Sequence, residues 1–169
     1  MHIRFITTGG TIDKIYFDAK SRFEVGESQI KHILTEGLVE FDYDVVSMFQ
    51  KDSLDMTDED RSALRAFIEQ DGADRYVISH GTDTMVETAI ALRGIPGKHV
   101  VLTGALSPAR FRSTDAVFNV ALAVAAVQLV GEGVYIAMNG QIFGADDVRK
   151  NREENRFETL RVGKNDKAS

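Results

Sequence analysis

The 169-residue chain has 43% hydrophobic residues and a formal net charge of −6, so it is long and apolar enough for one domain with its own core. The acidic balance argues against a nucleic-acid partner, because phosphate backbones are bound by clustered Lys and Arg. The lack of cysteine excludes disulfides, thiol nucleophiles and thiolate metal sites.

The first part of the chain predicts two strands and a short helix. Met1 leads directly into an apolar run at 2–6, which predicts a first strand and no signal peptide. The mixed segment 13–26 lacks a clear period, so we expect a long loop or a loose hairpin there. A short amphipathic helix is expected over 27–36, and the alternating segment 43–49 predicts a second strand.

A capped helix and a third strand are predicted in the middle of the chain. Residues 52–56 are expected to form a loop, and Thr57 is a good N-cap for the helix that follows. The buried stripe of that helix is expected at Leu64, Phe67 and Ile68. Strand three is expected over 75–80, with a further helix running on to about Gly94.

The last part of the chain predicts two more strands of the sheet and a long helix. The strands are expected over 98–103 and 133–138. Between them, Ser113 or Thr114 is expected to cap a helix that runs to about Val130. Short strands are predicted at 142–143 and 157–160, and the charged run 146–156 between them is typical of a solvated face.

Strands that alternate with helices and are continuously apolar predict a three-layer α/β domain over residues 1–169. We expect a doubly wound, mostly parallel sheet with helices on both faces, of Rossmann or flavodoxin-like type. Strands one, three and four all end in glycine followed by small or hydroxyl residues. Such loops meet at one edge of a parallel sheet, where open α/β sheets bind their ligands, so a site is predicted there.

Hydroxyl, acid and base groups are available at this predicted edge. Thr11 and Thr82 follow two strands that can be neighbours, Asp83 comes next to Thr82, and Lys150 lies downstream. A hydroxyl becomes a useful nucleophile when a neighbouring base takes its proton. The bland alternative is that hydroxyls and carboxylates at strand ends cap the following helix, while Lys150 belongs to a solvated charge run.

Other kinds of site have little support. His80 at a strand end is expected to be a hydrogen-bonded structural residue, and the spacing of the other histidines predicts no metal site. No GxGxxG or GxxxxGK[ST] motif occurs, so we expect no nucleotide and no other cofactor. The most apolar run, 116–130, is too short to span a bilayer, so we expect a cytoplasmic protein with no membrane partner.

Four segments, in order along the chain, resemble the signatures of the bacterial-type L-asparaginases. They are TGGTI at 8–12; HGTDTM at 80–85 with ETA at 87–89; VVLTGA at 100–105 with Pro108, STD at 113–115 and Asn119; and DVRK at 147–150. Two of these motifs are highly specific. The resemblance implies an amidohydrolase with a threonine nucleophile, which converts the side-chain amide of L-asparagine, or of glutamine or a related amide, into acid and ammonia.

The resemblance also assigns roles to residues. Thr11 would be the nucleophile, and Thr82, Asp83 and Lys150 would form a second, triad-like cluster. Main-chain N–H groups near Thr11 and Thr82 would form an oxyanion hole. The substrate-binding set would be Gly10, Ser53, Asp55, Gly81, Thr82 and Asp83.

The sequence departs from the family pattern in three places that bear on function. Leu54 follows Ser53 where many members have a polar residue, which removes one possible substrate contact. Members usually have a smaller C-terminal domain, which in a neighbouring subunit often completes the pocket, whereas this sequence ends at Ser169. The N-terminal loop of the family carries a Tyr that helps to activate the nucleophile, and the match SRFEVG at 21–26 has Phe23 there. Tyr16, earlier in the same loop, is therefore our candidate for that catalytic hydroxyl.

Two functions from different classes remain open. The intact Thr11, Thr82, Asp83 and Lys150 favour an enzyme that takes a small amino-acid amide. The missing domain and Phe23 favour a non-catalytic amino-acid-binding or regulatory protein that retains the pocket. Because family sites are built across subunits and the helix at 116–130 is apolar, we also expect a homo-oligomer, a dimer or higher.

Overall fold

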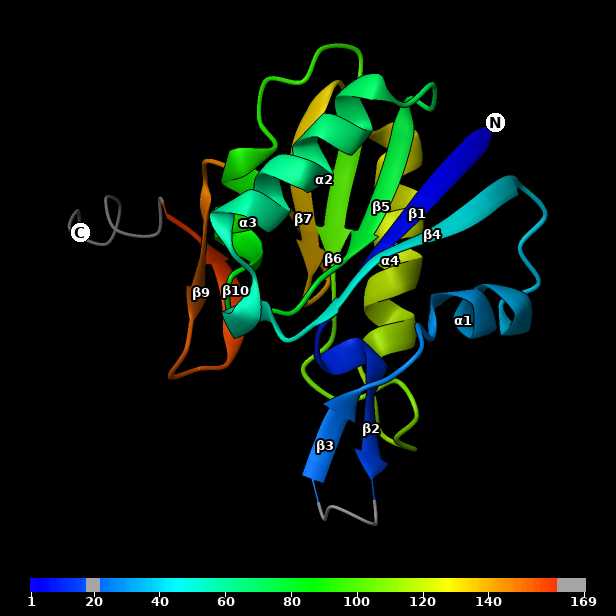
Figure 1. Ribbon diagram of the computed structural model, residues 1–169, viewed down its shortest axis with the longest axis vertical. Coiled ribbons are helices and arrows are strands. Elements are labelled where there is room, and N and C mark those ends of the chain that lie inside the picture. The colour runs from blue at the N-terminus through cyan, green and yellow to red at the C-terminus, as the bar shows by residue number, and fades with distance from the viewer. Residues whose placement is uncertain (18–21, 161–169) are drawn as a thin grey trace, which may run out of the picture.

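The computed structural model describes residues 1–17 and 22–160, and its centre is a six-stranded sheet (Figure 1). Five strands run parallel and the edge strand β8 runs antiparallel to β7. In spatial order the strands are β4 (Asp42–Lys51), β1 (His2–Gly9), β5 (Arg75–Ser79), β6 (His99–Thr103), β7 (Gly133–Met138) and β8 (Gln141–Gly144). The predicted mostly parallel sheet is confirmed, and β1, β5 and β6 are adjacent in it.

Helices cover both faces of this sheet (Figure 1). Helices α2 (Asp58–Gln70) and α3 (Met85–Ala91) pack on one face, whereas α1 (Ile30–Glu36) and α4 (Ala116–Leu129) pack on the other. Each face therefore has its own buried apolar cluster. The predicted α/β fold with helices on both faces is confirmed.

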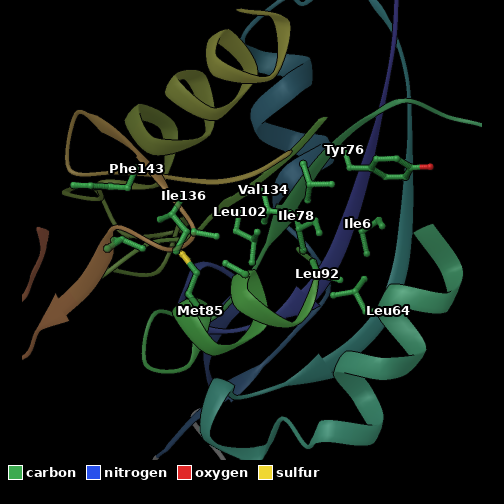
Figure 2. Close-up of a cluster of buried hydrophobic side chains, with 14 of the residues drawn as sticks. Ile6, Leu64, Tyr76, Ile78, Met85, Leu92, Leu102, Val134, Ile136 and Phe143 are labelled. Atoms are coloured by element: carbon green, nitrogen blue, oxygen red, sulfur yellow. The ribbon is translucent and has the colours of Figure 1, made fainter. Parts of the chain in front are cut away.

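Alternation along the central strands supplies these two clusters. Ile78 and Leu102 point to the α2/α3 side, where Figure 2 shows them beside Met85 and Leu92 of the α3 region. Their chain neighbours Val77 and Val101 belong to the α1/α4 side, and all of these side chains have 0% exposure. A strand that is buried on both faces is continuously apolar in sequence, which is why the unbroken apolar runs could locate these strands.

The predicted start of α2 is confirmed by its hydrogen bonds. Thr57 Oγ1 accepts the N–H of Asp60 at 3.3 Å, and Asp60 Oδ2 accepts the N–H of Thr57 at 2.9 Å. This reciprocal pair is a capping box, which satisfies N–H groups that have no partner inside the helix. Leu64 and Ile68 are fully buried as expected, whereas Phe67 is only partly buried.

Two antiparallel hairpins flank the edge of the sheet where the parallel strands end (Figure 1). The first joins β2 (Lys14–Phe17) to β3 (Arg22–Val25), so of the two alternatives for 13–26 the hairpin is the correct one. The second joins β9 (Val148–Asn151) to β10 (Arg156–Thr159). The prediction of a solvated face for 146–156 is wrong at β9, because Val148 and Phe157 anchor this hairpin in the core.

Smaller elements also differ from expectation. The segment 52–56 contains a 3-10 helix at Ser53–Asp55 instead of a plain loop. Asp115 occupies the N-cap position of helix α4, but its carboxylate accepts the N–H groups of Leu106 and Ser107 and does not cap the helix. The Thr114 hydroxyl accepts the N–H of Ala116 at 3.1 Å, so Thr114 satisfies the first N–H of the helix, in line with the expectation that Ser113 or Thr114 caps it. Within the described part of the chain, no helix has the length and apolar character that crossing a membrane requires.

Candidate active site

The floor of the candidate site is formed by glycine residues whose backbones directly contact the neighbouring loops. Gly10 has a φ of +92°, and a Cβ added to it would lie 2.4 Å from Gly81 N. A Cβ added to Gly81 would lie 2.5 Å from the Ser53 Cβ. A Cβ added to Gly104, at the end of β6, would lie 2.3 Å from the His80 carbonyl oxygen. Only glycine lets these loops approach so closely, so the predicted meeting of three glycine loops at one edge is confirmed.

Thr11 begins a short 3-10 helix, Thr11–Asp13, directly after this floor. The Lys14 N–H donates to the Thr11 carbonyl, and the N–H of Ala109 donates to the Ile12 carbonyl at 3.0 Å. Hydrogen bonds thus hold this turn on both sides. The Thr11 residue is half-buried, and since Gly10 contacts Gly81, the backbones that carry Thr11 and Thr82 lie side by side.

Lys150 joins two of the predicted site residues. Its Nζ lies 2.8 Å from Thr82 Oγ1 and 2.7 Å from Asp83 Oδ1. The Lys150 side chain is 11% exposed, whereas that of Asp83 is 38% exposed. The hydroxyl, acid and base groups of the predicted cluster are therefore in contact, and the carboxylate is its most accessible member.

Ser53 lies against the same cluster from the end of β4. Its Oγ accepts the N–H of Asp83 at 3.3 Å, and its carbonyl accepts the Thr84 hydroxyl at 2.6 Å. The residue is 2% exposed, so it belongs to the floor of the site. Since the Ser53 oxygen serves as the acceptor for Asp83, its hydroxyl hydrogen can be donated elsewhere.

An ion pair that the sequence did not indicate fixes the serine turn. Asp52 caps the 3-10 helix at the Leu54 N–H, and its other oxygen pairs with Lys14 Nζ at 2.6 Å. Partial burial acts to raise the pKa of Asp52, but the hydrogen bond and charge of Lys14, together with the N–H groups of Leu54 and Ser53, hold that pKa below its usual value. Lys14 directly follows the Thr11–Asp13 turn, so the two turns of the site are coupled.

Asp55 is not brought into the cluster, and Tyr16 is placed by its backbone alone. Asp55 is exposed at the end of its 3-10 helix, where its N–H donates to the Asp52 carbonyl at 3.0 Å. Tyr16 is in β2, with Phe23 as its register partner in β3. The side chains of Tyr16 and Phe23 lie outside the part of the chain that the structure describes.

His80 is a buried structural residue, as the sequence predicted. Its Nδ1 lies 2.7 Å from the Gly81 carbonyl oxygen, and its Nε2 lies 2.9 Å from the Thr88 hydroxyl. Thr88 Oγ1 in turn accepts from Arg61 Nε at 3.1 Å. Burial lowers the pKa of His80 to about 4, so the ring is neutral at neutral pH.

A chain of asparagines that sequence reasoning missed supports the β9–β10 hairpin. Asn119 Oδ1 accepts the Asn139 N–H at 3.3 Å, and Asn139 Oδ1 accepts the Phe157 N–H at 2.9 Å. Phe157 is the register partner of Lys150. The position of Lys150 therefore depends on Asn139, for which the only signal in the sequence was a turn-forming Asn-Gly pair.

A buried carboxyl ends the Thr11–Asp13 turn. Asp13 is 1% exposed, and its Oδ1 accepts the Gln29 N–H at 2.8 Å. Burial raises the pKa of Asp13 to about 6, against hydrogen bonds from Gln29 and Ser28 that act to lower it. Among residues 1–17 and 22–160, no three His, Asp or Glu side chains come together as a metal site would require.

Comparison with known proteins agrees with this architecture. The family model "Asparaginase, N-terminal" matches residues 2–165. An L-asparaginase from Bacillus licheniformis is 33% identical over 164 residues, and the alignment covers 88% of this chain and 49% of that protein. A probable periplasmic L-asparaginase from Haemophilus influenzae is 44% identical over 82 residues, which are 46% of this chain and 24% of that protein.

A solved structure is similar over nearly the whole chain. The probable cytoplasmic L-asparaginase from Campylobacter jejuni superposes with a TM-score of 0.73 and is 30% identical. The match covers 94% of this chain and 51% of that one. The chain thus spans about half, or less, of the length of these relatives.

Proposed function

The chain belongs to the asparaginase family, and on that basis we propose that it is an amidohydrolase which releases ammonia from the side-chain amide of L-asparagine or a related amide. The observation that carries the proposal is the contact of Lys150 Nζ with both Thr82 Oγ1 and Asp83 Oδ1, beside the Gly10–Gly81 floor. A fixed hydroxyl, carboxylate and ammonium in one place suit proton transfer and charge stabilisation during acyl transfer.

In the proposed reaction, Thr11 is the nucleophile. Its hydroxyl oxygen attacks the amide carbon, and main-chain N–H groups next to Thr11 and Thr82 stabilise the oxyanion. Collapse of this intermediate releases ammonia, with the hydroxyl proton passing to the leaving nitrogen, and leaves an ester on Thr11. Water then attacks the ester beside Thr82 and Lys150, which yields the acid and restores the threonine.

Substrate recognition is proposed to use the charges of an amino acid. The Asp83 carboxylate, at 38% exposure, is accessible to an α-ammonium group. Ser53 can donate its hydroxyl hydrogen to the α-carboxylate, because its oxygen already accepts from Asp83 N. Asp55 stays a proposed substrate contact, and its exposure in the structure means that it would reach the ligand only from the rim.

The test is ammonia release from L-asparagine and L-glutamine by the purified chain, with Thr11→Ala in parallel. We expect turnover that Thr11→Ala lowers by about 10³-fold or more while aspartate binding persists. Thr35→Ala, at an exposed hydroxyl on α1, is the matched control and should keep full activity. No turnover, together with thermal stabilisation by aspartate, would instead favour the amino-acid-binding or regulatory protein.

Tyr16 is proposed to supply the activating hydroxyl that Phe23 lacks. The two residues are register partners across the β2–β3 hairpin, so the backbone places them next to each other. Tyr16→Phe should lower kcat, and Phe23→Tyr added to that variant should restore it. Equal activity of wild type and Tyr16→Phe would remove Tyr16 from the mechanism.

We extend the proposal to residues 1–169 as one asparaginase N-terminal-like domain that forms a homo-oligomer in the cytoplasm. Support for assembly comes from α4, whose outer face exposes Val117, Phe118 and Leu129 at 52%, 62% and 85%. Apolar side chains gathered on one helix face often mark a protein–protein contact. Light scattering of the purified chain tests this part, and a monomer at all concentrations would contradict it.

A further inference from the structure

A buried hydrogen-bond chain runs from α2 to the floor of the site, and its direction can be deduced. Arg61 Nε carries a hydrogen and can only donate, so Thr88 Oγ1 accepts from it at 3.1 Å. The Thr88 hydroxyl hydrogen is then available to His80 Nε2 at 2.9 Å. The Gly81 carbonyl oxygen can only accept, so Nδ1 carries the ring hydrogen and donates to it at 2.7 Å, and Nε2 of the neutral ring is the acceptor.

Burial allows the hydrogen bonds from Arg61 through Thr88 to His80 only one arrangement. His80 and Thr88 are both 0% exposed, so water cannot take the place of either partner. A buried polar group without a partner costs roughly 1–3 kcal/mol, and a switch of tautomer would leave both the Gly81 carbonyl and the Thr88 hydroxyl without a matching group. The contacts of both ring nitrogens thus favour the neutral form of His80 that carries its hydrogen on Nδ1.

The Gly81–Thr82 peptide is held by this bond. The peptide is trans, so the Thr82 N–H points opposite to the Gly81 carbonyl. Since the carbonyl points to the buried imidazole, the Thr82 N–H points away from it. Gly81 is also wedged between Gly10 and Ser53, which leaves its backbone little room to turn.

We propose that His80 is a positioning residue, which fixes the Thr82 amide toward the substrate through the Gly81 carbonyl and is itself held in one tautomer by Thr88 and Arg61. This inference rests on the proposed function in one respect, because the Thr82 N–H acts there as an oxyanion donor. It assigns a role to a histidine that touches neither the substrate nor the reacting atoms. The tautomer of His80 and the orientation of the Gly81–Thr82 peptide can be measured whether or not the protein is an active enzyme.

The first test does not depend on turnover. Nitrogen-15 NMR of the histidine rings should show His80 as the neutral Nδ1–H tautomer between pH 5.5 and pH 8. Thr88→Val, which removes the hydroxyl at nearly constant shape, should leave Nε2 without its donor, shift the Nε2 resonance and shift the Thr82 amide resonance. A neutral Nε2–H ring in the wild type, or a charged ring at pH 6, would overturn the proposal.

The second test separates positioning from folding. His80→Asn keeps an N–H donor near the place of Nδ1, whereas His80→Leu has none. We expect His80→Leu to lower kcat by about 10²-fold with little change in KM, as for loss of an aligned oxyanion donor, and His80→Asn to regain at least about tenfold. Equal losses in the two variants would overturn the proposal.

A matched control comes from the other end of the sheet. His99 Nδ1 lies 3.0 Å from the Val130 carbonyl at the start of β6, so His99→Leu also removes a histidine–carbonyl contact but should leave kcat unchanged. If His80→Leu does not fold, Thr88→Val provides the kinetic comparison. If the wild type shows no turnover, the proposed function fails, and the NMR tautomer with the Thr82 amide shift still decides the role of His80.

Discussion

Lys150 Nζ lies 2.7 Å from Asp83 Oδ1, although 67 positions of sequence separate the two residues. The lysine is the more enclosed partner, with 11% of its side chain exposed against 38% for the aspartate. The ammonium also reaches Thr82 Oγ1 at 2.8 Å. One side chain therefore organises both polar groups at the end of β5.

Lys150→Met should lower kcat for ammonia release by about 10²–10³-fold, because Thr82 and Asp83 lose the charge that orients them. The free energy of unfolding should fall by only about 1–2 kcal/mol, since the Asp83 carboxylate can be solvated once its partner is gone. Steady-state kinetics and urea unfolding measure the two effects. Activity within about twofold of wild type would show that the cluster is structural.

The neighbouring Arg149 is the control for Lys150. It occupies the same strand with 63% exposure and pairs with Glu158 at 2.6 Å, away from Thr82 and Asp83. Arg149→Met removes a cation of the same hairpin and should leave kcat unchanged. A comparable loss in Arg149→Met would mean that the hairpin as a whole, and not the Lys150 ammonium, is responsible.

Gly81→Ala should disrupt the site by steric overlap. The new Cβ would lie 2.5 Å from Ser53 Cβ and 2.7 Å from its Oγ, so the serine turn must move. We expect a loss of about 1–3 kcal/mol in the free energy of unfolding, typical of overpacking, and at least about a tenfold loss of kcat. Ser53→Gly in the same chain should recover stability but not activity, because the proposed carboxylate contact is gone.

Gly72→Ala is the matched control for the glycine substitution. Nothing lies within 4 Å of a Cβ at Gly72, and its backbone does not need a positive φ. The same change there should be neutral, or stabilising by up to about 1 kcal/mol. Equal effects at Gly72 and Gly81 would show that the close approach of Gly81 to Ser53 does not matter.

The sequence predicted the sheet and the ends of its strands because those features have local causes. Continuous apolar runs produce the strands that are buried on both faces, and the glycines after β1 and β5 mark the close contact at Gly10 and Gly81. The capping box at Thr57 was likewise visible as a hydroxyl before an acidic turn. Each of these signals lies within a few residues of its effect.

The features that the sequence did not predict depend on partners far along the chain. The run around Lys150 had the composition of a solvated face, and only the burial of Val148 and Phe157 turns it into a hairpin against the site. The Lys14–Asp52 pair and the Arg61–Thr88–His80 chain also join separate elements. Single-sequence patterns do not encode which distant side chains will meet.

The pH dependence of stability should contain two opposing contributions. The pKa of Asp13 is raised to about 6 by burial, so the folded state binds this proton more tightly than the unfolded chain. Its contribution to the free energy of unfolding is present below about pH 4 and is lost as the pH rises through 6. The pKa of His80 is lowered to about 4, and its contribution is instead present above about pH 6.5 and lost as the pH falls through 4.

Asp13→Asn should therefore make the contribution of His80 to the pH dependence of stability measurable by itself. Each group changes the free energy of unfolding by up to about 1.4 kcal/mol per pH unit, so the two nearly cancel in wild type between about pH 4 and 6. In Asp13→Asn, stability should rise with pH across this window. Urea unfolding at several pH values measures the slope, with Asp42→Asn, at an exposed carboxylate, as a control that should follow wild type. If the free energy of unfolding of Asp13→Asn and of wild type changed with pH in parallel, this would contradict the raised pKa of Asp13.

Asn139→Gly should reduce activity by releasing Lys150. Asn139 has a φ of +54°, which glycine adopts without strain, so this change removes the side chain and keeps the turn. What is lost is the 2.9 Å bond from the Phe157 N–H to Asn139 Oδ1, and Phe157 is the register partner of Lys150. We expect kcat to fall by about tenfold or more while the free energy of unfolding changes by about 1 kcal/mol. Asn139→Asp, which keeps the acceptor oxygen, should retain most of the activity.

Asn155→Gly tests whether this effect belongs to Asn139 or to any left-handed asparagine. Asn155 has a φ of +48° in the turn between β9 and β10, and it is exposed. Glycine there relieves the same backbone strain without removing a bond to β10, so stability should stay level or rise slightly and kcat should not change. If Asn155→Gly and Asn139→Gly lose activity equally, mobility of the hairpin is the cause; if only Asn139→Gly loses it, the side-chain bond to Phe157 holds Lys150 against Thr82.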